Sequence, residues 1–274
     1  MISEMFSYGF IQRAFLGGML VSLCAALLGV SLVLKRYSMI GDGLSHVSFG
    51  ALSIAIACGI APLKFAIPVV IIAAFLLLRL AEDGKMRSDA AIAMVSASAL
   101  AIGVIVTSLT TGLSTDIYSY MFGSILAMTK DDVIVCVGLS VIVIIMFIFC
   151  YHRVFAVTFD ENFSKATGVQ VGMYNTLISV LTAVTVVIGI KMMGAMLISS
   201  LIIFPALTSM RVFKSFLSVT ICSAILSIFN FSIGLICSYA FSIPAGASVV
   251  VVNLGMFIIF SFALFKRTIV RVKK

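Results

Sequence analysis

The sequence predicts an all-α protein, a polytopic transmembrane bundle of about nine helices, and three observations lead to this prediction. Hydrophobic residues make up 62% of the 274 residues and charged residues only 10%. Such a chain has too few polar side chains to cover a water-soluble domain. Apolar runs also recur along the whole sequence, and most charged residues lie between them. We therefore expect a single transmembrane domain over residues 1–274, with its backbone polar groups bonded within helices.

The length of each apolar run sets the candidate spans. About 20 helical residues cross a bilayer core of ~30 Å, because each residue rises ~1.5 Å. The seventh run is short and contains Pro205, so the bundle has eight spans if that run does not cross completely. In order, the runs are Ala14–Leu34, Ile40–Gly59, Leu63–Leu80, Ala90–Thr110, Val133–Cys150, Val171–Ile190, Met193–Ser209, Phe216–Phe241 and Ala247–Phe265.

The positions of Lys and Arg predict the orientation, because short loops rich in these residues stay in the cytoplasm. With the N-terminus outside, only four of the 18 basic residues fall on the outer side: Arg13, Lys64, Lys130 and Lys191. We therefore expect the N-terminus outside and the C-terminus in the cytoplasm. The net charge of +8 does not indicate nucleic-acid binding, since the basic residues are dispersed in small groups between apolar runs.

The inner segment at about 155–170 is predicted to contain a short helix between two spans. Asp160 is a good N-cap residue, Glu161 suits the positive end of a helix, and Gly168 suits the left-handed residue after a helix end. A plain connecting loop that happens to carry these residues is the alternative.

Asp42 and His46 form the candidate site. They are four residues apart, so on a helix they share one face. Carboxylate oxygen and neutral imidazole nitrogen are ordinary ligands for zinc and manganese. Two protein ligands also leave coordination positions open, which suits an ion that must depart again. The pattern predicts a divalent-cation site.

Membrane depth favours this functional interpretation of the pair. The other acidic residues fall in loops or at helix ends, and an ionisable group held inside a membrane usually marks a pathway. The structural alternative is that Asp42 caps the second helix while His46 is hydrogen-bonded within the bundle. Gly41, Gly43 and Gly50 surround the pair and would allow close packing of helices.

Several enzymatic chemistries are absent from the sequence. It has no HExxH motif of a zinc protease. The one Gly-Lys pair, Gly84-Lys85, lacks the first glycine and the final Ser or Thr of a phosphate-binding loop. We expect no enzymatic activity in this chain, and if ATP drives the protein, another chain must bind it.

The stretch LKRYSMIGDGLSHVSFGAL, Leu34–Leu52, resembles the GD-x-LSH signature of the metal-ion ABC transporter permeases, the ABC-3 family. Family members often have an acidic residue just before their Pro-x-Gly motif, where this chain has Ser242. The outer opening of the transport pathway would therefore be less acidic in this chain. Four further motifs resemble the family's in the same order: MFGSIL (Met121–Leu126), FDENFSKATGV (Phe159–Val169), MGAMLISSLIIFPALTS (Met193–Ser209) and IPAGASVVV (Ile243–Val251).

The resemblance implies an architecture and its partners. The family has a homodimeric membrane core in the bacterial cell (inner) membrane, with the pathway between the subunits. Each subunit binds a cytoplasmic ABC ATPase, and an extracellular metal-binding protein delivers the ion. Asp42 and His46 match the family's intramembrane acidic and histidine positions. The segment Asp160–Gly168, which includes Glu161, Phe163 and Ala166, matches the coupling helix that docks on the ATPase.

The function implied is import of a divalent transition metal, which is cargo rather than a permanently bound cofactor. We favour zinc because imidazole ligation suits it, and manganese and iron are the other candidates. The alternative is an ion-coupled secondary carrier for a metal or small solute. Such a carrier usually needs several ionisable sites and often has an internal repeat, whereas this sequence has one pair and no clear repeat.

Overall fold

The computed structural model describes residues 8–37, 39–82, 88–110 and 130–272, and these residues contain helices and no strand. The MFGSIL motif at 121–126 lies outside the described residues. The helices are α2 (Gly9–Leu34), α3 (Ile40–Ala57), α4 (Pro62–Glu82), α5 (Ser88–Leu109), α7 (Lys130–Phe149), α8 (Tyr151–Phe159), α9 (Glu161–Ala166), α10 (Val171–Met193), α11 (Ala195–Val212), α12 (Phe216–Phe241) and α13 (Ala245–Val272).

Every expected apolar run forms a helix, but fewer than nine are long and apolar enough to span a membrane. Six described helices meet that condition, and a seventh span results if α7 and α8 count as one span with a 68° bend. The third and seventh runs form α4 and α11, whose apolar parts, Lys64–Leu77 and Met196–Val212, are shorter. Each of these helices contains an internal proline, Pro68 or Pro205. The expectation of nine spans is therefore not confirmed.

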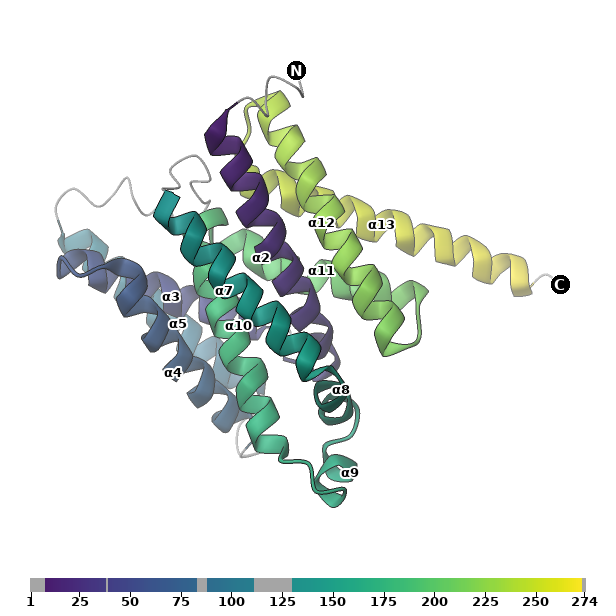
Figure 1. The fold of residues 1–274 in the computed structure, drawn as a ribbon. Coiled ribbons are helices and arrows are strands. Elements are labelled where there is room, and N and C mark those ends of the chain that lie inside the picture. The colour runs from purple at the N-terminus through teal and green to yellow at the C-terminus, as the bar shows by residue number, and fades with distance from the viewer. Residues whose placement is uncertain (1–7, 38, 83–87, 111–129, 273–274) are drawn as a thin grey trace.

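The segment at 155–170 is more helical than the sequence indicated. We expected a loop with one short helix, but the chain first forms α8 and only then α9. The first helix exists because Val154 and Val157, three residues apart, both face the protein interior and are buried. In Figure 1, α8 and α9 lie at the same end of the bundle.

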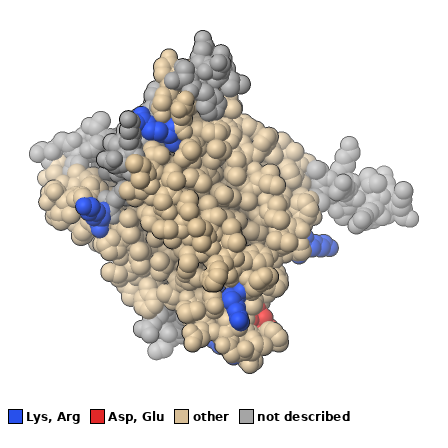
Figure 2. Space-filling view, viewed as in Figure 1, with Lys and Arg blue, Asp and Glu red and all other residues tan. Residues whose placement is uncertain are grey.

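The arrangement of the long helices is shown in Figure 1, where α2 crosses the middle of the bundle. It packs against α7, α10, α11 and α12, while α3 packs against α4 and α5. The last helix, α13, packs against α11 and α12 and then extends away from the rest of the bundle. Figure 2 shows that the charged side chains on one face lie toward its edges and leave its middle uncharged, as a lipid-facing surface requires.

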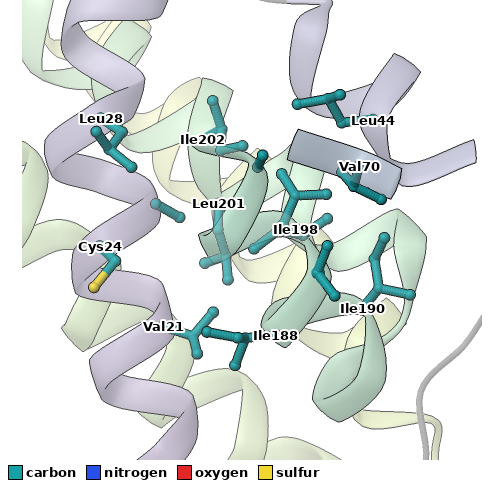
Figure 3. Packing of buried hydrophobic residues seen from close by; sticks show 14 of the residues in the cluster. Val21, Cys24, Leu28, Leu44, Val70, Ile188, Ile190, Ile198, Leu201 and Ile202 are labelled. Carbon is teal, nitrogen blue, oxygen red and sulfur yellow. The ribbon is translucent and has the colours of Figure 1, made fainter. Parts of the chain in front are cut away.

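Helix α11 lies at the centre of the packing, because it contacts α2, α3, α10, α12 and α13. Its residues Ile198, Leu201 and Ile202 are buried, and Figure 3 shows them between α2 on one side and Leu44 of α3 on the other. Val21 and Leu28 supply the α2 side of this contact. Contacts with the surrounding helices therefore fix the position of α11, although this helix is short.

Glycines allow three of these helices to approach closely. A Cβ added to Gly29 of α2 would lie 2.1 Å from the carbonyl oxygen of Ile202, and one added to Gly41 of α3 would lie 2.8 Å from Ile202 Cδ1. The other two glycines near the candidate pair contact α5: a Cβ on Gly43 would lie 2.7 Å from Ile92 Cγ2, and one on Gly50 would lie 2.8 Å from the Ala99 carbonyl oxygen. These four positions tolerate no side chain without movement.

We predict that Gly50→Ala lowers the stability of the protein by about 1–3 kcal/mol, the usual range for overpacking, because α3 and α5 must separate. The measurement is thermal unfolding in detergent. Gly138→Ala is the matched control, since Gly138 lies inside α7 with nothing within 4 Å of its added Cβ. The control should be neutral or slightly stabilising, because alanine favours a helix. Equal unfolding temperatures for the two variants would contradict this packing.

Candidate metal site and the segment at 155–170

The candidate pair lies at the start of α3. The helix begins at Ile40, so Asp42 is in the first turn and His46 is one turn further along. The N-cap residue is Met39, which makes no side-chain cap hydrogen bond. Asp42 therefore does not cap this helix, and the structural alternative for the aspartate is wrong.

The two side chains face each other at a distance that suits a shared ion. Asp42 Oδ2 and His46 Nε2 are 3.6 Å apart, beyond the usual length of an N–H···O hydrogen bond. Two ligand atoms bound ~2.1 Å from a tetrahedral ion are themselves about 3.4 Å apart. The Asp42 side chain is 43% exposed and that of His46 27%, so an ion has access to both.

A third polar side chain reaches the pair from α11. Ser199 Oγ donates toward Asp42 Oδ1 over 3.5 Å, which makes this a loose contact. Sequence reasoning missed Ser199, although it and Ser200 form a polar dipeptide in an otherwise apolar stretch. The two serines face different neighbours, because successive helical residues point about 100° apart.

Ser200 belongs to a separate buried network. It accepts a hydrogen bond from Asn253 Nδ2 of α13 at 3.1 Å, and Asn253 Oδ1 accepts one from Asn230 Nδ2 of α12 at 2.7 Å. All three side chains are buried. This network fixes α11 against the two C-terminal helices and does not touch the candidate pair.

The site is open rather than closed. Among the described residues no group of three or more His, Cys, Asp and Glu side chains could hold a metal ion. Structural zinc sites have four protein ligands, whereas two protein ligands and a hydroxyl leave positions for water or for ligands from another chain. Such a ligand set would suit a divalent cation that is bound weakly.

The segment at 155–170 has the helix ends that its sequence predicted. Asp160 caps α9 by accepting a hydrogen bond from the Phe163 N–H at 2.9 Å. After α9 ends, Gly168 adopts φ +82°. The N–H groups of Gly168 and Val169 then bond the carbonyls of Lys165 and Ser164, which is a Schellman helix end.

The residues of this segment point in two directions. Phe163 is 65% exposed, and Ala166 is also exposed. Glu161 instead faces the bundle, where its Oε1 lies 2.7 Å from Lys35 Nζ and accepts a hydrogen bond from Asn175 Nδ2 at 3.2 Å. The structure thus brings Glu161 together with two residues that sequence reasoning did not select.

The environment of Glu161 keeps its carboxyl group ionised. Burial by itself raises the pKa of Glu161, while the hydrogen bond and positive charge of Lys35 lower it. Asn175 and Lys165 act in the same direction as Lys35, so the pKa falls below its usual value. Glu161 and Lys35 are therefore an ion pair at neutral pH.

Ser242, which stands where an acidic residue would be expected by family resemblance, is exposed after the end of α12. Its backbone is left-handed, with φ +52° and ψ +40°. This conformation costs an ordinary residue about 1–2 kcal/mol, less where a short polar side chain forms local hydrogen bonds.

Comparison with known proteins identifies a family and several relatives. The ABC 3 transport family model matches residues 7–264. A probable metal transport system membrane protein of Treponema pallidum is 32% identical over 250 residues, which cover 91% of this chain and 93% of the relative. The manganese import system permease protein ScaB of Streptococcus gordonii is 26% identical and covers 95% and 94% of the two chains. The high-affinity zinc uptake system membrane protein ZnuB of Haemophilus influenzae is 28% identical and covers 93% and 96%.

A solved structure shares the fold. The chain is 27% identical in sequence to a chain in the structure of PsaBC from Streptococcus pneumoniae in complex with Fab, with a TM-score of 0.85. The match covers 95% of each chain. The helical arrangement described above is therefore shared with this solved structure over nearly its full length.

We predict that Ser199→Ala weakens binding of a divalent metal to the purified protein by roughly 2- to 10-fold, because one hydrogen bond to the Asp42 carboxylate is worth about 0.5–1.5 kcal/mol. The measurement is titration with zinc and with manganese. Ser98→Ala is the control, because Ser98 is exposed on α5 and bonds only the Met94 carbonyl of its own helix. Affinities that are the same in both variants would show that Ser199 plays no part in the site.

Proposed function

We propose that this chain, which belongs to the ABC 3 transport family, is the membrane permease subunit of an ABC importer for a divalent transition metal. The observation that carries the proposal is the pair of Asp42 and His46, whose ligand atoms lie 3.6 Å apart in an apolar helix. A dehydrating ion needs such ligands on its way through an apolar core. In a homodimer the pair would be doubled, so that four ligands face one pathway.

Zinc is our first candidate for the cargo. Imidazole nitrogen is a borderline ligand that suits zinc, while carboxylate oxygen also accepts manganese and ferrous iron. Relatives of this chain named for zinc uptake and for manganese import are similarly distant from it. Uptake of each metal separately, by the complex in vesicles, decides between them.

Two features indicate the partners of this chain: it has no phosphate-binding loop, and the helix α9 is exposed. Since the sequence has no phosphate-binding loop, a cytoplasmic ABC ATPase would bind and hydrolyse the ATP, docking on α9 at Phe163. An extracellular metal-binding protein would supply the ion, and the complex would lie in the bacterial cell membrane. Membership of an ABC family favours this assembly over an ion-coupled secondary carrier.

We predict that Asp42→Asn and His46→Ala each abolish metal uptake by the reconstituted complex, because each removes one of two ligands. Protein level, dimerisation and basal ATP hydrolysis should stay nearly unchanged. His152→Ala is the matched control, since His152 is the second of the chain's two histidines and is exposed on α8. Normal uptake by either site variant, with protein level controlled, would defeat the assignment of the pair as ligands.

We also predict the orientation, because the Lys and Arg bias places the loop after α11 inside and the start of α13 outside. In a variant without native cysteines, Lys214→Cys should react with a membrane-impermeant reagent only after the cells are opened. Ala245→Cys should react in intact cells. Labelling of position 214 from outside intact cells would reverse the orientation.

A further inference from the structure

We propose that Lys35 is the positioning residue through which movement of α9 reaches the start of α3, and that Glu161 holds Lys35 rather than contacting the ATPase. This inference rests on the proposed function, in which α9 docks on an ATPase and Asp42 with His46 receives the ion. It concerns the connection between those two sites, which lie in different parts of the fold.

Three elements meet at the Lys35 ammonium group. Lys35 follows the last residue of α2, Glu161 is the first residue of α9, and Asn175 lies in the second turn of α10. Lys35 Nζ is 2.7 Å from Glu161 Oε1 and also donates to Asn175 Oδ1. Asn175 Nδ2 closes the triangle by donating to Glu161 Oε1 at 3.2 Å.

Burial makes this triangle more than a surface ion pair. The Lys35 side chain is only 6% exposed and Asn175 is buried, while the Glu161 side chain is 39% exposed, so the burial lies on the lysine side of the triangle. A buried ammonium group needs charged or polar partners that replace its hydrating water. Ion pairs that are fully exposed to solvent contribute little to stability by comparison. Lys35 therefore has to follow Glu161 when α9 moves, because separation would leave its charge without the carboxylate.

The chain after Lys35 connects the triangle to the candidate metal site. Arg36 has φ +62°, and its N–H bonds the carbonyl of Val33 at 3.1 Å, while the Tyr37 N–H bonds that of Leu32 at 2.8 Å. The Ile40 N–H then bonds the carbonyl of Tyr37 at 3.0 Å, at the first residue of α3.

The connection is short, and its described residues on both sides of position 38 are hydrogen-bonded, so we expect it to transmit displacement instead of absorbing it. Asp42 is only seven positions after Lys35. Arg36 occupies a left-handed position that favours glycine, and such strain persists only where the surroundings fix the backbone. A shift of Lys35 therefore reaches the turn of α3 that holds Asp42.

In this arrangement one face of α9 binds the ATPase and the other binds Lys35. Phe163 is exposed and available to a partner, while Glu161 is turned toward Lys35. One turn of α9 thus contains both the residue that would contact the ATPase, Phe163, and the residue that binds Lys35, Glu161. Glu161 is thereby separated from the docking surface to which the sequence resemblance assigned it.

The test uses the full permease reconstituted with its ABC ATPase and metal-binding protein in vesicles. Three quantities are measured for each variant: bound ATPase, ATP hydrolysis and metal taken up per ATP hydrolysed. The variants are Lys35→Met, Glu161→Gln and the two combined. Lys214→Met is the matched control, because it removes an equally positive but exposed side chain from the loop before α12.

We expect Lys35→Met and Glu161→Gln each to lower metal uptake per ATP by about tenfold, a change typical of the coupling between two sites. Bound ATPase should stay within about twofold of wild type, because Phe163 is untouched. The double variant should be no worse than either single one, since both remove the same interaction. Lys214→Met should match wild type.

Several outcomes would overturn the inference. If metal uptake per ATP is unchanged in both single variants, Lys35 does not connect α9 to α3. The same follows if Lys214→Met lowers metal uptake per ATP equally. Loss of bound ATPase in Glu161→Gln alone would return Glu161 to the docking surface. If Lys35→Met does not fold, Glu161→Gln decides alone, because its amide keeps the shape of the glutamate side chain.

A separate arm tests the proposed function itself. Phe163→Ala should lose bound ATPase, and the wild-type complex should take up metal only with ATP. If wild type shows no ATP-driven uptake, the proposed function fails and the inference fails with it. If wild type transports and Lys35→Met couples normally, only the inference fails.

Discussion

The close approach of α11 to α2 and α3 is the constraint on which the candidate site depends. A single residue, Ile202, fills the space left by two glycines: its carbonyl oxygen lies against Gly29 and its side chain against Gly41. Gly41 directly precedes Asp42, and Ser199 lies one turn before Ile202 on α11. Because the backbones meet there, Ser199 reaches a carboxylate on another helix. Larger residues at either glycine would move α11 outward and withdraw the Ser199 hydroxyl from Asp42.

This packing also explains why the site is open. Hydrophobic contacts, and a buried Ser200–Asn253–Asn230 network, hold α11 from the sides that face away from Asp42. The position of α11 therefore does not depend on the pair alone, and both ligand atoms stay partly exposed. A site with a third or fourth ligand would hold the ion and the helices together. Transport requires the opposite, because binding must be weak enough for release.

The sequence predicted features that depend on local or periodic physics. The length of the apolar runs predicted where the helices lie, and α12 begins at Phe216 and ends at Phe241 as expected. The known preferences of helix ends predicted the roles of Asp160 and Gly168 at the two ends of α9. The sequence did not show contacts between residues far apart in the chain. Lys35 and Glu161 are separated by 126 positions, and Asp42 and Ser199 by 157. The spacing of Asp42 and His46 was visible because both residues lie on one helix. Their neighbour on α11, and the inward direction of Glu161, depend on tertiary packing.

Helices α2, α3 and α9 end in the same hydrogen-bond pattern, but the left-handed residue is a glycine in α3 (Gly59) and α9 and an arginine in α2. At the end of α9 the left-handed position is Gly168, which adopts φ +82° without strain. At the end of α2 the equivalent position is Arg36, for which the left-handed conformation costs about 1–2 kcal/mol. Glycine would relieve that cost but would also give the connection to α3 the freedom to bend. An L residue there restricts the turn to the geometry in which the Arg36 N–H donates to the Val33 carbonyl and the Tyr37 N–H to that of Leu32. The strain is therefore consistent with a connection whose stiffness matters more than its stability.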